Sequence, residues 1–205
     1  ILRIGANDTI GSSILNDYLK CFQEIHPHEE IQVVISNSSL LCEMVHTNKL
    51  DLLLTDEFHS TADLTFFSVC EEQFVAVVEK NHPLALASQV QLKDLSTSKL
   101  LLREKGSDVR DYFDSLMNDN GYHADAFWES ISFDILLSTA LRSEGIALLP
   151  RQYVESNVEL GNLVILNIPE FHYTQNLILA YKKNKYITPQ MDDFIEICKT
   201  YTTMI

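Results

Sequence analysis

The sequence lacks the features that mark a membrane protein or a nucleic-acid-binding surface. No apolar run approaches the roughly 18 residues that a membrane-spanning helix needs. The formal net charge is −14 over 205 residues, so we do not expect this chain itself to grip a phosphate backbone. A basic pocket stays compatible with that balance, because a pocket is local. No signal peptide is visible, and the start at Ile1 suggests a trimmed chain.

Metal and redox motifs are missing as well. The four cysteines, Cys21, Cys42, Cys70 and Cys198, form no Cys-x-x-Cys pair, and the seven histidines are scattered. We expect reduced, mostly buried thiols in a cytoplasmic protein, and no metal site.

Catalytic signatures are equally scarce. The sequence contains no Gly-x-Ser-x-Gly elbow, no His-Glu-x-x-His, no phosphate-gripping glycine–lysine loop and no dinucleotide fingerprint. Its many carboxylates are typical of a solvated acidic surface. We therefore expect neither an enzyme nor a bound cofactor.

What the chain does have, over residues 1–55, is an alternation of strand and helix patterns. Period-two alternation predicts strands at 2–5 and 31–35, and an apolar run predicts a buried strand at 52–54. Apolar residues at helical spacing predict helices over 10–25 and from residue 40. In a parallel α/β sheet, the loops after such strands lie at one edge, over helix N-termini. Their polar residues should therefore gather in one place.

The residues expected at this edge are Thr9, Asn37, Ser38 and Thr55. The loops offer free N–H groups and the positive ends of helix dipoles, which suit a small anion or carboxylate. Side-chain hydroxyls add donors that carry no charge. Any one of these residues could equally be an ordinary helix cap, and it is their convergence that favours a binding site.

The pattern recurs in the second half and predicts a second lobe. After a polar loop at 57–63, strands are expected at 64–70, 74–78, 100–102, 124–129, 146–149, 163–168 and 177–181, and helices at 90–95, 109–117, 133–144 and from Thr188. A chain that builds this lobe and returns must cross twice, and we place the crossings near Glu71–Gln73 and Tyr181–Lys183. The prediction is an α/β protein with one lobe from residues 1–72 and 182–205 and another from residues 73–181.

The second lobe has candidate binding residues of its own. Arg103 ends a predicted strand and could form a bidentate pair with a ligand carboxylate, or a salt bridge to Glu104 or another nearby carboxylate. Ser107 and Ser132 precede predicted helices, as the first-lobe candidates do. Arg110, one turn into a helix, is more typical of an ion pair.

Five segments, taken together, resemble the effector-binding domain of LysR-type transcriptional regulators. In chain order they are Leu2–Ala6 with Thr9–Gly11, Asn48–Leu52, His82–Leu84, Arg103–Ser107 with Arg110, and Glu144–Pro150. The Arg103–Ser107 segment resembles the branch that includes regulators of sulfur assimilation and carbon fixation. Each motif alone is weak, whereas their order and spacing cover nearly the whole chain.

The resemblance implies a type 2 periplasmic-binding-protein fold, with two Rossmann-like lobes joined by two crossover strands and an effector in the cleft between them. At the positions where the family holds its effector, this sequence has Thr9, Ser38, Thr55 and Ser107, with Ser132 at a common helix start. It departs from the family at Asp8, Phe133 and Ser143. These departures bear on the class of effector.

The resemblance also implies partners. The family's winged helix-turn-helix precedes this domain and is absent here, so DNA would be contacted only through that missing domain. A homodimer is implied, a tetramer in the full-length protein, and contact with RNA polymerase. In the dimer, helix one of one chain meets a second-lobe helix of the other, and Tyr18, Leu137 and Leu141 are candidates for that contact or ordinary core residues.

The function that the resemblance implies is effector sensing. A small metabolite, anionic or carboxylate-bearing, would change lobe closure and subunit packing and so alter how attached helix-turn-helix domains sit on DNA. The alternative is a solute-binding protein of a transporter with the same fold. Four unpaired cysteines and the lack of a lipobox disfavour that alternative.

Overall fold

The computed structural model describes residues 1–56, 62–142 and 145–201, and the chain divides into two compact units. Unit 1 comprises residues 1–71 and 175–205, and unit 2 comprises residues 72–174. The first boundary falls within the expected crossing at Glu71–Gln73. The second falls between Thr174 and Gln175, well before the expected Tyr181–Lys183. The reason is strand pairing, because Ile178–Ala180 already pair with a strand of unit 1.

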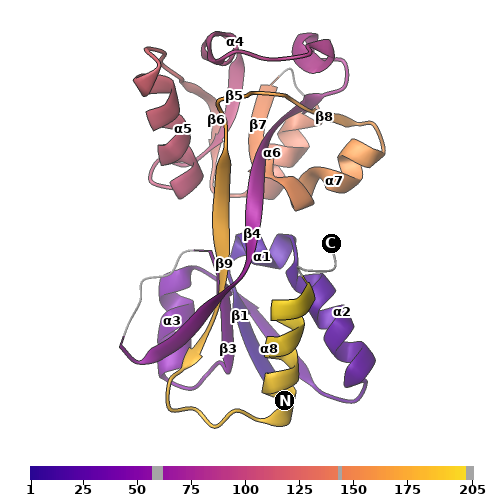
Figure 1. Ribbon diagram of the computed structural model, residues 1–205, viewed down its shortest axis with the longest axis vertical. Helices are drawn as coiled ribbons and strands as arrows, with labels where there is room; N and C mark the ends of the chain where they lie inside the picture. Colours follow the sequence, from indigo (N-terminus) through magenta and orange to yellow (C-terminus); the bar gives the residue numbers. More distant parts are fainter. Residues whose placement is uncertain (57–61, 143–144, 202–205) are drawn as a thin grey trace. The chain divides into compact units, whose positions relative to one another are not determined.

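Unit 1 is a sheet with helices on both faces (Figure 1). Its strands are β1 (Leu2–Ala6), β2 (Ile31–Ile35), β3 (Leu52–Thr55), the first part of β4 (Leu64–Glu79) and most of β9 (Tyr173–Lys182). Its helices are α1 (Asp8–Ser12), α2 (Leu15–Ile25), α3 (Ser38–His46) and α8 (Pro189–Tyr201). β1 pairs in parallel with β2 and β3, and β9 is antiparallel to β3. Leu52 and Leu54 pack in the core with α2 and α8, whereas Leu53 packs with α3 on the other face.

Unit 2 is likewise built around β-strands. Its strands are the end of β4 (Leu64–Glu79), β5 (Lys99–Arg103), β6 (Ala126–Ser130), β7 (Gly145–Pro150) and β8 (Leu163–Ile165). β5 pairs in parallel with β6 and β7, and β4 is antiparallel to β7 and β8. The helices are η1 (Pro83–Leu86), α4 (Leu92–Ser96), α5 (Asp108–Asp119), α6 (Phe133–Ala140) and α7 (Arg151–Glu159). Figure 1 shows α5 on one side of this sheet and α6 and α7 on the other.

Two expected elements have different bounds in the structure. The helix predicted over residues 10–25 is divided into α1 and α2 at Ser13, which lies outside helical backbone geometry. The hydroxyls of Ser12 and Ser13 donate to the carbonyls of Asp8 and Thr9 at 2.6 and 2.7 Å. Such side-chain bonds compete with the regular helical ladder.

The two strands predicted at 64–70 and 74–78 are one strand, β4. The polar triplet Glu71-Glu72-Gln73 interrupts the apolar pattern but not the extended backbone. Burial keeps its period of two, because Glu71 and Gln73 are exposed while Glu72 is buried. A charged side chain thus occupies an inward position, which the sequence pattern does not reveal.

Other differences concern helix ends and the loop after β3. α6 ends at Ala140 instead of Glu144, and Gly145 begins β7 instead of closing the helix. α7 was not predicted. Residues 57–61 of the predicted loop lie outside the described residues, as do Ser143 and Glu144. Cys70 and Cys198 are buried, whereas Cys21 and Cys42 are only partly so.

The final helix begins as its sequence predicts. Pro189 is the first residue of α8, and the Thr188 hydroxyl accepts a hydrogen bond from the Met191 N–H at 3.3 Å. Among the helices of the described residues, none combines the length and hydrophobicity needed to cross a membrane.

Asp51, which is buried itself, joins three segments of unit 1 through a partly buried charge network. Its carboxylate accepts hydrogen bonds from Arg3 Nε and Nη2 at 2.9 and 2.8 Å, and lies 2.7 Å from Lys185 Nζ. Burial alone would raise the pKa of Asp51, but the bonds from Arg3 and Lys185 outweigh it and lower the pKa to about 2. The ion pairs therefore connect the residue just before β3 with β1 and with the segment that follows β9.

Glu72 is a buried carboxylate whose pKa is raised, in contrast to that of Asp51. Its side chain is buried, Oε1 accepts a hydrogen bond from the Gln152 N–H at 3.2 Å, and Oε2 has no hydrogen-bond partner among the described residues. Burial raises the pKa of Glu72 to about 7, against the lowering effect of the backbone N–H groups at the start of α7. The folded state therefore favours the protonated carboxyl group.

We predict that Asp51→Asn destabilises the protein by about 2 kcal/mol, because it leaves Arg3 and Lys185 without their counter-charge. The pKa of Asp51 is about 2 in the folded protein, and its ordinary value is 3.8. The contribution of the Asp51 carboxylate to stability is therefore complete above pH 4 and is lost as the pH falls from about 4 to about 2. Urea denaturation followed by circular dichroism measures both effects. An Asp51→Asn protein that is as stable as the unaltered chain at pH 7 would contradict the prediction.

We predict that Glu72→Gln stabilises the protein at pH 8 and has little effect near pH 5. The folded pKa of about 7 exceeds the ordinary value of 4.5, so the unaltered protein loses stability as pH rises between them, on the order of 3 kcal/mol in total. The amide keeps an acceptor for the Gln152 N–H without a charge. The matched control is Glu71→Gln, at the exposed neighbouring residue. Its free energy of unfolding should change between pH 5 and pH 8 by the same amount as that of the unaltered chain.

Candidate functional site

The candidate site in unit 1 lies where three parallel strands end. Ala6 at the end of β1 is in register with Ile35 of β2 and Leu54 of β3. The polar segments that follow these strands therefore emerge at the same edge of the sheet. α1 and α3 begin directly there, after the N-cap residues Asn7 and Asn37.

Two of the predicted site residues are in direct contact. The hydroxyls of Ser38, at the start of α3, and Thr55, at the end of β3, form a hydrogen bond of 2.9 Å. Thr55 is fully buried and Ser38 is partly exposed. A hydroxyl pair of this kind carries no charge and can exchange donor and acceptor roles when a third polar group arrives.

Thr9 and Asn37 make hydrogen bonds that belong to their own helices. Thr9 lies in α1 and is 6% exposed, and its carbonyl accepts the Ser13 hydroxyl. The Asn37 side chain accepts the Leu40 N–H at 2.9 Å, so its oxygen serves as the cap of α3. The sequence is compatible with capping or binding for these residues, and in the structure Asn37 has the capping role.

A further contact at this edge was not predicted. The Asn7 amide donates to the Asp56 carboxylate, while its oxygen accepts the Ile10 N–H at 3.3 Å. Asn7 is buried. Its position directly before a helix was the only signal in the sequence, and that signal indicates a cap as readily as a partner for Asp56.

In unit 2, Arg103 is already paired. Its guanidinium donates to both carboxylate oxygens of Glu104 at 2.7 and 3.0 Å and lies over the ring of Phe133, 4.3 Å from the centroid. Burial raises the pKa of Glu104, but the hydrogen bonds from Arg103 outweigh it, and the pKa is lower than usual. Of the two roles expected for Arg103, the structure shows the salt bridge.

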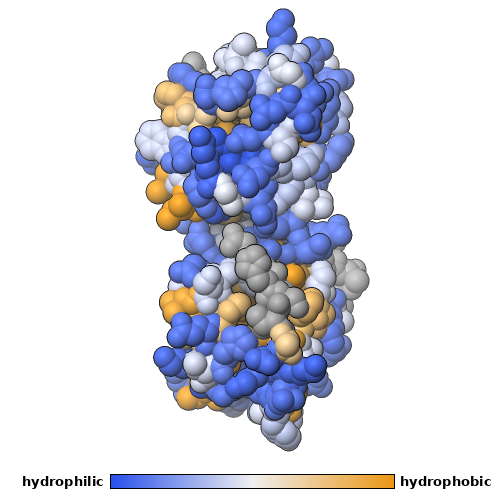
Figure 2. All heavy atoms as spheres, turned by 90° about the vertical axis from the view of Figure 1, so that its left-hand side faces the viewer, coloured by the Kyte–Doolittle hydropathy of each residue, from blue (hydrophilic) through white to orange (hydrophobic). Residues whose placement is uncertain are grey.

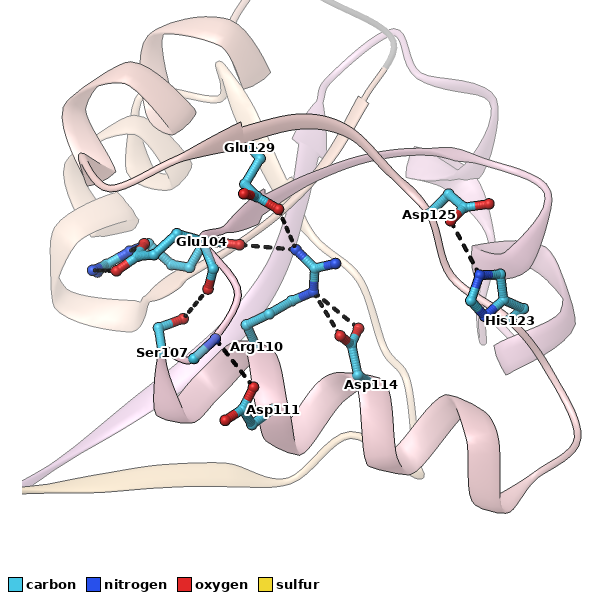
Figure 3. Close-up of polar contacts among 10 residues, drawn as sticks. Glu104, Ser107, Arg110, Asp111, Asp114, His123, Asp125 and Glu129 are labelled. Atoms are coloured by element: carbon cyan, nitrogen blue, oxygen red, sulfur yellow. Dashed lines mark hydrogen bonds and ion pairs between the residues drawn. The ribbon is translucent and has the colours of Figure 1, made fainter.

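Ser107 and Ser132 occupy the N-cap positions of α5 and α6, yet neither side chain caps its helix. The Ser107 hydroxyl donates instead to the Glu104 carbonyl at 3.0 Å (Figure 3). The two serines follow β5 and β6, which are parallel, with Arg103 in register with Ser130. They therefore lie at the same edge of the unit 2 sheet.

Arg110 is buried and forms an ion-pair network with more partners than the single ion pair expected from the sequence. Its Nε donates to both oxygens of Asp114 at 2.9 Å, and its Nη1 donates to the Arg103 carbonyl at 3.0 Å and to Glu129 at 3.2 Å (Figure 3). The Arg110 side chain is 3% exposed. This network links α5 to the ends of β5 and β6 and holds the loop that carries Ser107.

The two units are thus α/β layers with polar residues at the carboxyl ends of their parallel strands, the arrangement of a small-molecule-binding domain. The sequence matches the family described as LysR substrate binding domain over residues 1–203. The chain belongs to this family, which confirms the resemblance read from its motifs.

Among curated proteins, the HTH-type transcriptional regulator CysL of Bacillus subtilis is 25% identical over 199 residues, which cover 97% of this chain and 67% of the relative. The chain spans about two thirds of the length of the curated relatives it matches. These relatives are transcriptional regulators, so the match does not favour the solute-binding alternative.

Solved structures show the same fold. The regulatory domain of Synechocystis CcmR in complex with 2-PG has a TM-score of 0.81 at 22% identity, covering 98% of this chain and 96% of that one. The effector-binding domain of QuiR in complex with shikimate has a TM-score of 0.76 at 21% identity, covering 99% and 97%. The chain therefore has the type 2 periplasmic-binding-protein fold of two α/β lobes joined by crossing strands, as predicted.

Proposed function

We propose that the chain is the effector-sensing domain of a LysR-type transcriptional regulator and that a small anionic or carboxylate-bearing metabolite binds at the strand ends of unit 1. The observation that carries the proposal is the 2.9 Å hydroxyl pair of Ser38 and Thr55 beside the N-terminus of α3. The positive end of the α3 dipole and the neutral hydroxyl donors suit an anion, and no acidic residue lies in the first turn of α3.

The relatives support this reading, because solved domains of the same fold are complexes with 2-PG and with shikimate. The same effector would also be held by Ser107 and Ser132 if the family pattern applies, and that stays a prediction. Arg103 donates Nε and Nη2 to Glu104, so it can join either through Nη1 or by exchanging Glu104 for the ligand.

We propose further that the longer protein acts in the cytoplasm, contacts DNA through a helix-turn-helix domain outside this chain, forms a tetramer, and acts on transcription through contact with RNA polymerase. In such a regulator an effector acts by favouring one of two subunit arrangements. The relatives named as HTH-type regulators support the DNA-binding part of this proposal.

A second copy of the chain is the partner proposed for the exposed apolar residues. Figure 2 shows apolar patches on a face that is otherwise largely hydrophilic. Within the described part of the chain, β2 and β6 each have one strand neighbour, and both expose apolar side chains: Val33 and Ile35 on β2, and Phe127 and Trp128 on β6. Exposed edges with apolar side chains favour association. Tyr18, a predicted contact residue, is instead fully buried, so only Leu137 and Leu141 remain from that set.

We predict that Ser38→Ala and Thr55→Val each weaken effector binding roughly tenfold, because each removes one hydroxyl donor of the pair. Calorimetric titration of the purified chain with a panel of small carboxylates and phosphate esters measures this. The matched control is Ser39→Ala, the exposed neighbour on α3, which should bind as the unaltered chain does.

Ser107→Ala tests whether unit 2 contributes to the same effector. A loss comparable to that of Ser38→Ala supports a shared ligand, whereas unchanged affinity restricts the site to unit 1. If none of these changes alters the affinity for a compound that the chain does bind, the strand-end site is wrong.

We predict that Trp128→Lys weakens the homodimer roughly 30-fold or more, because it places a charge in an apolar contact. Light scattering after gel filtration over a range of concentrations measures the dissociation constant. Tyr186→Lys, another exposed aromatic, is the control and should leave the dimer intact. A Trp128→Lys protein that dimerises like the control would rule out β6 as the contact.

A further inference from the structure

Unit 2 contains a cavity that the proposed effector site does not use. Its volume is about 280 Å³, and it lies between α5, the segment before β6 and β6 itself. Six of its lining residues have ionisable side chains: Lys105, Arg110, Asp114, His123, Asp125 and Glu129. One water occupies about 30 Å³ of liquid, so the cavity has room for a small organic molecule.

The wall of this cavity is built by helix periodicity. Arg110, Asp114 and Asn118 lie one turn apart along α5 and all line the cavity. Glu129 approaches from β6 and pairs with Arg110 at 3.2 Å. At the other end, His123 and Asp125 are 3.1 Å apart and largely exposed, which leaves that end open to solvent.

One nitrogen of Arg110 is available to a ligand. Nε and Nη1 are bonded, as described above, but Nη2 donates no hydrogen bond within the described residues. Figure 3 shows this nitrogen directed toward the side on which His123 and Asp125 lie. A guanidinium this deeply buried holds its charge away from bulk water, so an acceptor at Nη2 would be favourable.

The charges around the cavity select the kind of ligand. Two cations, Lys105 and Arg110, face three carboxylates, Asp114, Asp125 and Glu129. A simple anion would meet a net negative wall, and a simple cation would meet the two basic side chains. A molecule with a carboxylate and an ammonium group a few bonds apart satisfies both.

We propose that this cavity binds a small zwitterion of the α-amino acid class, with its carboxylate on Arg110 Nη2 and Lys105 and its ammonium group on Asp125. Because Arg110 also donates to the Arg103 carbonyl, an occupant of the cavity would act on the loop that carries Ser107. The site is separate from the strand-end site of unit 1 and would give the domain a second input.

The test is a titration of the isotope-labelled chain with L-alanine, followed by amide NMR shifts. We expect shifts at Lys105, Arg110, Asp125 and Ala126, and a much weaker response to acetate or methylammonium alone. Lys105→Ala and Asp125→Asn should each weaken binding roughly tenfold. Asn118→Phe, an exposed change that fills the cavity, should abolish it.

Asp119→Asn is the matched control, because Asp119 is an exposed α5 carboxylate outside the cavity lining. It should bind L-alanine as the unaltered chain does. The proposal is overturned if L-alanine at millimolar concentrations shifts none of the cavity residues, if shifts appear only around Ser38 and Thr55, or if Asp125→Asn and Asp119→Asn bind equally well.

Discussion

The parallel pairing of β1 with β2 and β3 is the constraint on which the candidate site depends. Main-chain hydrogen bonds put Ala6, Ile35 and Leu54 in register, so the three strands end together. Whatever follows them must share one edge of the sheet. That register brings the hydroxyls of Ser38 and Thr55 within hydrogen-bond distance of each other. Backbone geometry has therefore gathered groups that lie far apart in the chain.

Unit 2 repeats the layout with different electrostatics. Its strand ends carry a cation, but Arg103 is already engaged by Glu104 and by the Phe133 ring. A ligand that takes the place of Glu104 on Arg103 must displace a bidentate carboxylate, which is costly. The hydroxyls of Ser38 and Thr55 in unit 1 are uncharged. A ligand that binds to them therefore does not have to break a salt bridge between these two residues. Unit 1 thus offers neutral donors, and unit 2 offers a cation that already has a carboxylate partner.

The extent of sequence prediction follows from which interactions are local. Apolar patterning identified β1, β2 and β3, and the Thr188–Pro189 pair identified the start of α8, because these depend on neighbours in the chain. It failed at β4, where Glu72 occupies a buried strand position that no pattern based on hydrophobicity assigns to a carboxylate. It also left Arg110 as an ordinary ion pair, because its burial depends on Glu129 from β6, which is distant in sequence. Fold class is encoded locally, whereas the surroundings of each site residue are set by tertiary contacts.

Asp51 and Glu72 show that burial alone does not decide what a carboxylate does. Both side chains are buried, and burial pushes both pKa values upward. Asp51 has two cations within hydrogen-bond distance, and its pKa falls to about 2. Glu72 is held by backbone N–H groups instead of by a cation, and its pKa rises to about 7. The first group therefore holds unit 1 together as a permanent anion, while the second changes charge near neutral pH at the residue where β4 enters unit 2.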